Sequence, residues 1–268
     1  MRRKLFAFDI DGTLLDSNKR PLASTIEALQ ELRNAGHFVT LATGRTRFLA
    51  QDLIYQLEFD NYILCNGSAA FLNHHQVYKR LLPQVEMQRF VKEAKELGID
   101  TVFVGIDAYK RNTTFNLAKI EDAMHSVGST APDLDYNFAQ REDIYQGLAF
   151  YDASLEHYFD DKYPNLSFVR WHENGVDVIP KGGSKAATIL TLAQRLGIAQ
   201  EDIISFGDGM NDREMLQVSG CGIAMGNGNA SDEVALCADR ITDDNDHDGI
   251  WQALDKLGFL NKLVKKRA

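Results

Sequence analysis

Short apolar runs alternate with longer amphipathic stretches over much of the chain. Three runs, Lys4–Phe8, Phe38–Ala42 and Ile203–Gly207, are closed by glycine or polar residues, as buried strands usually are. Tyr62–Cys65 is a further short run of this kind. Because strands that alternate with helices join into parallel sheets through right-handed crossovers, the pattern predicts an α/β fold.

The predicted helices have recognisable ends. Ser24-Thr25-Ile26-Glu27 has the sequence of a capping box, which would begin the first helix, and Gly36 is placed to end it. A second helical stretch runs from about Thr46 to Leu57. Later in the chain, Lys185 opens a helical stretch over Ala186–Leu196.

The pattern changes between Pro83 and about Lys181. A helix over Gln84–Leu97 precedes candidate strands of alternating character: Thr101–Ile106, Gly147–Tyr151, Ser167–Trp171 and Val176–Ile179. Pro180–Gly183 has the composition of a hinge, and after it strands and helices alternate again through Gly222–Met225 and a closing helix over Asp248–Leu257. We therefore predict a core domain made of residues 1–82 and 183–268, which an α+β domain of residues 83–182 divides in sequence.

Composition narrows the class of protein. The 268 residues are 44% hydrophobic and 25% charged, as in ordinary globular proteins, and no apolar run approaches the roughly 20 residues of a membrane helix. A net charge of −9 argues against a nucleic-acid partner, and the short basic run Lys262–Arg267 is interpreted as a solvated terminus. Three cysteines without zinc-site spacing suit a reducing compartment, so we expect a cytoplasmic protein without a membrane partner. The oligomeric state cannot be read from these features.

Polar residues follow the predicted strands. Asp9 and Asp11 come after the first strand, Thr43 after the second, and Asp208 after the run that ends at Gly207. In an open parallel sheet the carboxyl ends of the strands meet at one edge, so we expect these side chains to converge there with Lys185.

The expected cluster has the chemistry of a magnesium and phosphate site. Two carboxylates about 4 Å apart repel by about 4 kcal/mol at an effective dielectric of about 20, so Asp9 and Asp11 need a cation or a proton between them. Asp208 and Asp212 add two further carboxylates, and the lack of histidine and cysteine in these segments favours Mg²⁺ over zinc. Lys185 at a helix start would bind phosphate.

Further phosphate contacts would come from Thr43, the Gly44 amide and Asn211. Phosphate held beside a metal and an aspartate allows attack by Asp9 on phosphorus, which gives an aspartyl-phosphate that water later hydrolyses. Asp11 would protonate the leaving alkoxide and then deprotonate the water.

Taken together, the motifs resemble the haloacid dehalogenase (HAD) superfamily, and within it the Cof-like subfamily of small-molecule phosphatases. The resemblance covers nearly the whole chain and rests on segments in the family's order: Phe8-Asp9-Ile10-Asp11-Gly12-Thr13-Leu14-Leu15, Ala42-Thr43-Gly44-Arg45, Lys185, and Gly207-Asp208-Gly209-Met210-Asn211-Asp212. It implies a Rossmann-like parallel-sheet core with an inserted α+β cap domain.

The resemblance also implies site roles. Asp9, Asp11 and Asp208 match metal ligands, Asp11 through its backbone carbonyl, and Asp212 matches a residue that supports the metal through its water shell. Thr43, Gly44, Lys185 and Asn211 match phosphate contacts. Arg45, a possible substrate contact, and the pair Asn66-Gly67 also look similar to the family. The chain departs from it at Gly226–Asn229, where two extra residues lengthen a loop, and at Ala235, where relatives usually have lysine.

Other functions share some of these features. A phosphomutase would use the same aspartyl-phosphate but return the phosphoryl group to a second hydroxyl, and a signalling receiver has a similar acidic pocket with threonine and lysine. An idle binding protein is a third alternative. The acid/base Asp11 and an insertion large enough to cover a substrate favour a phosphatase of small phosphorylated metabolites. We interpret the acidic run Asp243–Asp248 as a solvated loop and not as a second metal site.

Overall fold

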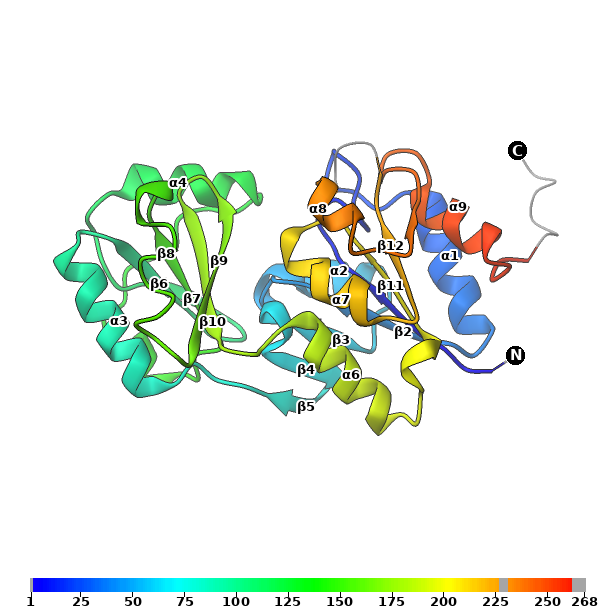
Figure 1. Cartoon of the computed structure of the whole chain (residues 1–268), viewed down its shortest axis with the longest axis horizontal. Helices are drawn as coiled ribbons and strands as arrows, with labels where there is room; N and C mark the ends of the chain where they lie inside the picture. Colours follow the sequence, from blue (N-terminus) through cyan, green and yellow to red (C-terminus); the bar gives the residue numbers. More distant parts are fainter. Residues whose placement is uncertain (1, 227–230, 262–268) are drawn as a thin grey trace. The chain divides into compact units, whose positions relative to one another are not determined.

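The chain forms two compact units in the computed structural model, which describes residues 2–226 and 231–261 (Figure 1). The core unit comprises Met1–Gly44, Gln51–Val77 and Ser184–Ala268, and the inserted unit comprises Arg45–Ala50 and Tyr78–Gly183. The sequence pattern does not predict that Arg45–Ala50 joins the inserted unit. The domain boundaries at residues 82 and 182 therefore remain predictions from the sequence.

The core unit is built on an eight-stranded sheet in the order β13-β12-β11-β1-β2-β3-β4-β5. The strands are β1 Leu5–Phe8, β2 Phe38–Ala42, β3 Tyr62–Leu64, β4 Ala69–Leu72, β5 His75–Lys79, β11 Ile203–Gly207, β12 Cys221–Ala224 and β13 Arg240–Ile241. All pairings from β13 through β3 are parallel, which confirms the predicted α/β class with a parallel-sheet core.

The apolar pattern missed the hairpin after β3, as well as the strands β5 and β13. β4 pairs antiparallel with β3 after the 3-10 turn η1, Cys65–Gly67. Three successive residues of that turn have positive φ, at 51°, 52° and 96°, and two of them are not glycine. Such a turn has no common sequence signature, so a strand that returns at once is not expected.

Helices cover both faces of the core sheet. They are α1 Ala23–Asn34, α2 Arg47–Gln56, α6 Lys185–Arg195, α7 Arg213–Val218, α8 Asp232–Ala235 and α9 Gly249–Lys256, with short 3-10 helices η3 Gln200–Asp202 and η4 Met210–Asp212. Right-handed crossovers run one way from β1 to β2 and the other way from β11 to β12, so α1 and α7 lie on opposite faces (Figure 1). α9 packs beside α1, and α6 packs beside α7.

The capping-box prediction for the first helix is wrong. The N-cap of α1 is Leu22, without a side-chain cap, so Ser24 already lies in the first turn. The Ser24 hydroxyl instead donates to Asp248 Oδ1 at 2.5 Å, immediately before α9. A tertiary bond to a carboxylate replaces the local bond that the motif indicated, because hydrogen bonds to charged acceptors are the stronger ones.

The inserted unit has its own antiparallel sheet in the order β7-β6-β8-β10-β9. Its elements are β6 Asp100–Val104, β7 Tyr109–Arg111, β8 Gln146–Phe150, β9 Leu166–His172, β10 Gly175–Pro180, α3 Gln84–Glu96, α4 Leu117–Ser126, α5 Phe138–Arg141 and the 3-10 helix η2 Ala153–Leu155. Phe90, Phe159 and Phe168 pack against one another in its core. The predicted α+β character is confirmed.

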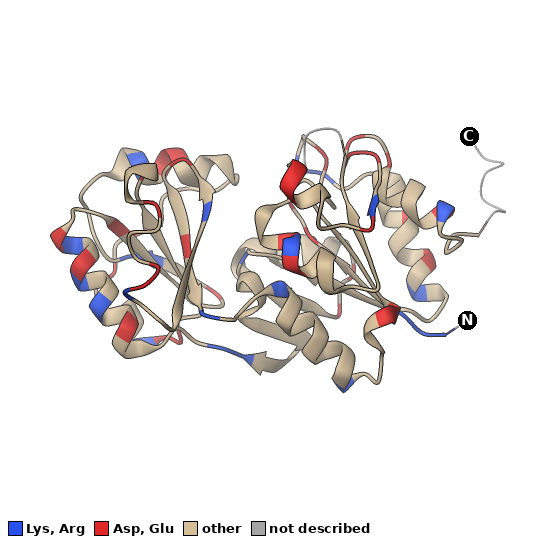
Figure 2. Cartoon of the chain, in the orientation of Figure 1, with Lys and Arg blue, Asp and Glu red and all other residues tan. Residues whose placement is uncertain are grey.

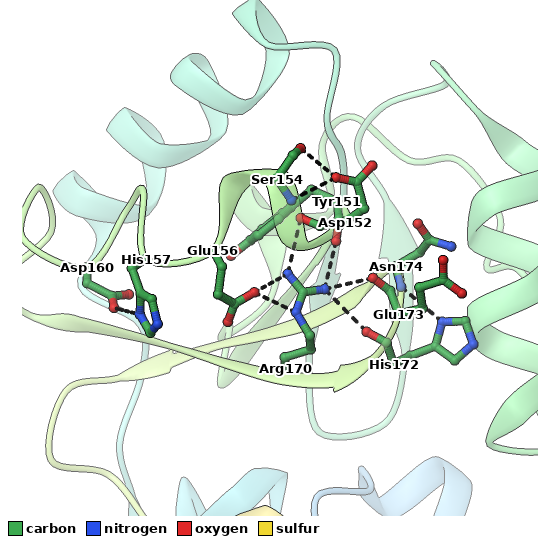
Figure 3. Close-up of polar contacts among 10 residues, drawn as sticks. All are labelled: Tyr151, Asp152, Ser154, Glu156, His157, Asp160, Arg170, His172, Glu173 and Asn174. Carbon is green, nitrogen blue, oxygen red and sulfur yellow. Dashed lines mark hydrogen bonds and ion pairs between the residues drawn. The ribbon is translucent and has the colours of Figure 1, made fainter.

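Arg170 on β9 ties the ends of several elements of the inserted unit together (Figure 3). One guanidinium nitrogen, Nη1, donates to the carbonyls of Tyr151 and Glu173 at 2.9 Å, and the Nε group donates to Glu156 at 2.6 Å. The end of β8 and the turn between β9 and β10 are thereby held by one side chain.

Candidate active site

Three of the candidate residues leave the core sheet at one edge. Asp9, Thr43 and Asp208 directly follow β1, β2 and β11. β1 lies between the other two strands and pairs in parallel with both, with Phe8 opposite Phe206 and Leu41. Since the three strands point the same way, their carboxyl ends bring these positions to the same rim (Figure 1).

Lys185 joins this rim from helix α6. Ser184 caps the helix by accepting a hydrogen bond from the Ala187 N–H, so Lys185 is the first helical residue. Its side chain is fully buried, and its ammonium lies 2.7 Å from Asp9 Oδ1 and 2.7 Å from Asp212 Oδ1. Residues 9, 185 and 212 thus form one buried cluster of charges.

Asp212 is held on both carboxylate oxygens. Oδ1 accepts from Lys185, and Oδ2 accepts from the N–H groups of Asp208 and Gly209 at 3.1 and 3.0 Å. Gly207 makes this close approach possible, because a Cβ there would lie 2.6 Å from the Cβ of Asp212. The turn after β11 is therefore locked to the lysine.

A second glycine makes room on the β1 side. Gly12 has φ of +75°, and a Cβ on it would lie 2.2 Å from Asp208 Oδ2. The hydroxyl of Thr13 donates to the other oxygen of Asp208 at 2.8 Å. Thr13 belongs to the motif that follows β1, but the sequence alone indicated no role for it.

Burial and mutual repulsion perturb the carboxylates. Oxygens of Asp9, Asp208 and Asp212 all lie within 4.8 Å of one another. Burial raises the pKa of Asp9 to about 7, with Asp212 adding to the rise and Lys185 opposing it. Burial, together with the negative charges of Asp9 and Asp212, raises the pKa of Asp208 to about 8. Burial alone would lower the pKa of Lys185, but the two aspartates outweigh it and the pKa is raised.

These shifts show that one ammonium group does not balance three carboxylates. A divalent cation would supply the missing positive charge, and the available donors are all carboxylate oxygens, the ligands that Mg²⁺ prefers. The residues present therefore fit a magnesium ion, with Asp9 and Asp208 as the candidate ligands, because the single charge of Lys185 is already shared between Asp9 and Asp212.

Asp11 is not one of the three carboxylates whose oxygens lie within 4.8 Å of one another. Its carboxylate is about one third exposed and accepts a hydrogen bond from Lys19 Nζ at 3.1 Å. The sequence did not indicate Lys19, since nothing in its spacing connects it with the motif.

Asn66 links the remaining phosphate-contact candidates. Its Oδ1 accepts from Asn211 Nδ2 at 2.9 Å and would lie 3.0 Å from a Cβ on Gly44. Its backbone N–H donates to the Thr43 carbonyl at 3.1 Å. Asn66 follows the predicted strand Tyr62–Cys65, so the rule that found Asp9 and Thr43 would also have found it.

Four further features of the sequence analysis are not among the residues that form this cluster. Arg45 belongs to the inserted unit, where it donates to the Leu49 carbonyl at 3.4 Å. Of the departure at Gly226–Asn229, residues 227–229 lie outside the part of the chain that the structure describes, as does the basic run at 262–267. Ala235, the other departure, ends the short helix α8.

A second acidic group occurs in the loop before α9. Ligand atoms of Asp243, Asp244 and His247 also lie within 4.8 Å of one another. Its histidine is exposed, and Asp244 already accepts from His247 Nδ1 at 2.6 Å. The prediction of a solvated loop is only partly correct, because Asp244 and Asn245 are buried.

A search of the described helices for one long and apolar enough to cross a membrane finds none.

The proteins that this chain resembles are hydrolases and phosphatases. The model of a family described as haloacid dehalogenase-like hydrolase matches residues 6–254. A protein of Bacillus subtilis named "Putative phosphatase YkrA" is 36% identical over 260 residues, which cover 97% of this chain and 100% of the relative. The 5-amino-6-(5-phospho-D-ribitylamino)uracil phosphatase YitU of the same species is 30% identical and covers 93% and 96%.

The solved structures agree. The sugar phosphatase BT4131, of HAD subclass IIB, has a TM-score of 0.84 and 29% identity, and the match covers 96% of this chain and 100% of that one.

Proposed function

The chain belongs to the haloacid dehalogenase-like hydrolase family and is a phosphatase of its Cof type, and we propose that it hydrolyses small phosphomonoesters, such as sugar phosphates or related metabolites, with Mg²⁺. The observation that carries the proposal is the buried cluster of Asp9, Lys185 and Asp212 beside Asp208, at the sheet edge where the strands end. The names of YitU and BT4131, which act on different phosphorylated small molecules, support the substrate class.

Asp9 is the proposed nucleophile. One carboxylate oxygen attacks phosphorus, the bond between phosphorus and the ester oxygen breaks, and an aspartyl-phosphate forms. Lys185 fixes the rotamer of Asp9 through its 2.7 Å hydrogen bond and places positive charge where the phosphoryl oxygens would lie. Bound Mg²⁺ would offset the negative charge of the carboxylates and the phosphoryl group.

Asp11 is the proposed acid and base. It gives a proton to the departing alkoxide and takes one from the water that attacks the aspartyl-phosphate, which releases inorganic phosphate and restores Asp9. In the structure Asp11 accepts a hydrogen bond from Lys19 Nζ at 3.1 Å, which orients its carboxylate. Thr43, Gly44 and Asn211 are the proposed phosphate contacts, with Asn211 held in place by Asn66.

The proposal is tested by measuring released phosphate from a panel of phosphorylated metabolites with Mg²⁺. Asp9→Asn keeps the size of the side chain but removes the nucleophile, so turnover should fall by at least about a thousandfold. The matched control is Asp161→Asn, an exposed aspartate of the inserted unit, which should leave turnover unchanged. An Asp9→Asn enzyme with near-normal rates on p-nitrophenyl phosphate would exclude Asp9 as nucleophile.

The same assay separates the alternatives, which the comparisons do not favour. A phosphomutase would convert a sugar phosphate into its isomer without releasing phosphate. A receiver would accumulate a long-lived phosphorylated protein. The proposed cytoplasmic location finds support in the cysteines, since Cys65, Cys221 and Cys237 form no disulfide bond.

A further inference from the structure

The inserted unit contains a cavity whose lining, unlike the acidic cluster, has no carboxylate. Its volume is about 330 Å³, and its residues come from α3, from the sheet and from the segment around α5: Gln84, Met87, Gln88, Val91, Lys92, Lys95, Phe103, Asn112, Tyr136, Ala139 and Gln140. None of them is among the candidate active-site residues. A cavity of this size lies at the lower end of the range for small-molecule sites, about 300 to 1,000 Å³.

One polar side chain in the lining is buried without a partner. Asn112 is only 5% exposed, and its backbone N–H donates to the Thr101 carbonyl at 2.9 Å. Its side-chain amide forms no hydrogen bond with any residue in the described part of the chain. A buried amide normally has partners, because leaving its donors and acceptors unpaired is unfavourable. An amide that faces a cavity without one is therefore available to a ligand.

The charge of the lining is positive. Lys92 and Lys95 lie one turn apart on α3, along which basic and acidic residues alternate (Figure 2). Neither lysine forms an ion pair with a described residue. The lining includes no aspartate or glutamate, although the protein has 38 acidic and 29 basic residues. This local excess favours an anion.

The rest of the lining is apolar or aromatic. Met87 and Phe103 are each 6% exposed, whereas the ring of Tyr136 is 59% exposed and accessible from solvent. Aromatic and methionine side chains pack well against a flat ring.

We propose that this cavity is a second ligand site, which binds a small planar anion: a heteroaromatic ring that carries one carboxylate or phosphate group. The ring lies against Met87 and Phe103, and the amide of Asn112 hydrogen-bonds the heteroatom at its edge. Lys92 and Lys95 bind the anionic group.

Titration of ¹⁵N-labelled protein with nicotinate and with pyridine-3-phosphonate tests the site. Both probes have a pyridine ring. The phosphonate represents a phosphate group that a phosphatase cannot hydrolyse. The probe that binds more tightly therefore identifies the anionic group that the site prefers. Either should shift the side-chain amide signal of Asn112 in a saturable way, and this signal is assigned from its absence in Asn112→Leu. Benzoate, which lacks the ring nitrogen, should bind more weakly than nicotinate.

Variants decide whether the named groups bind. Lys92→Gln with Lys95→Gln should weaken nicotinate binding about tenfold, since charge-assisted hydrogen bonds are lost. The control Lys181→Gln with Lys256→Gln makes the same change of charge at exposed lysines outside the cavity and should leave binding unchanged. Equal affinities in the two double variants, or no saturable shift of the Asn112 amide with any probe, would overturn the proposal.

Discussion

Each of the two units buries an aspartate, and the two carboxylates are held differently. Asp212 in the core unit accepts from one ammonium and two backbone N–H groups. Asp100 in the inserted unit, 2% exposed, accepts only from neutral donors: the Thr113 hydroxyl at 2.7 Å and the N–H groups of Phe115 and Asn116 at 2.9 and 2.6 Å.

The difference lies in what surrounds each carboxylate. The three donors to Asp100 come from one segment, residues 113–116, so this carboxylate holds a single loop in place. Asp212 shares Lys185 with Asp9 and lies next to Asp208, so the cluster keeps an excess of negative charge that only an added cation relieves. Burial of a charge alone therefore does not mark a reactive site; an unbalanced group of charges does.

Among variants that change the surroundings of the two buried aspartates, Lys185→Met should have the largest effect. The variant leaves Asp9 and Asp212 buried without their shared cation, so the free energy of unfolding should fall by about 3–5 kcal/mol and turnover should be lost. Denaturant unfolding with EDTA present and phosphate release with Mg²⁺ measure the two effects. Lys256→Met, at an exposed lysine, is the control. Turnover within tenfold of the unmodified enzyme would show that Lys185 has no part in the chemistry.

The second largest effect should come from added Mg²⁺, which we expect to bind the carboxylates of the core unit and not Asp100. Magnesium at about 100 times its dissociation constant should stabilise the protein by about 2.7 kcal/mol, seen as a raised melting temperature. Asp208→Asn should abolish this gain, whereas Asp244→Asn in the second acidic group should keep it. If Asp244→Asn abolished the gain and Asp208→Asn kept it, the metal site would lie in the loop before α9 instead.

Asp100→Asn should have a smaller and purely structural effect. The amide oxygen of the new side chain still accepts hydrogen bonds, but its NH2 group cannot, so at least one of the three donors loses its partner and the free energy of unfolding falls by about 1–3 kcal/mol. Turnover per folded molecule and the stabilisation by Mg²⁺ should both be unchanged. A loss of magnesium binding would mean that the two carboxylates are not independent.

The smallest expected effect concerns His37, a buried base, and the pH dependence of stability. Burial lowers the pKa of His37 below its ordinary value of 6.5, and Lys4 and Arg3 lower it further. The unfolded chain then binds a proton more readily, so this contribution to stability is present above pH 6.5 and is lost as the pH falls below it. Melting temperatures from pH 8 to pH 5 should fall less in His37→Leu than in the unmodified protein. Equal slopes would show that His37 does not titrate differently in the two states.

The folding pattern was predictable where local chemistry repeats. Strands β1, β2 and β11 are apolar runs that end at polar residues, so their parallel pairing and the shared edge follow from alternation with helices. β4 was not predictable, since it follows a turn of left-handed residues at Cys65–Gly67. The capping box failed because a distant carboxylate, Asp248, competes for the hydroxyl of Ser24.

For this protein, sequence alone determined which chemistry is available: carboxylates, a hydroxyl and one lysine at the ends of parallel strands, in the order of a known family. Only the tertiary structure decided which of these groups share a hydrogen bond. Lys185 bonds residues 176 and 27 positions away in the chain, and the unpaired amide of Asn112 has meaning only beside a cavity. Periodicity reports neighbours within one element, whereas charge balance and unmet hydrogen bonds depend on the packing of several elements together.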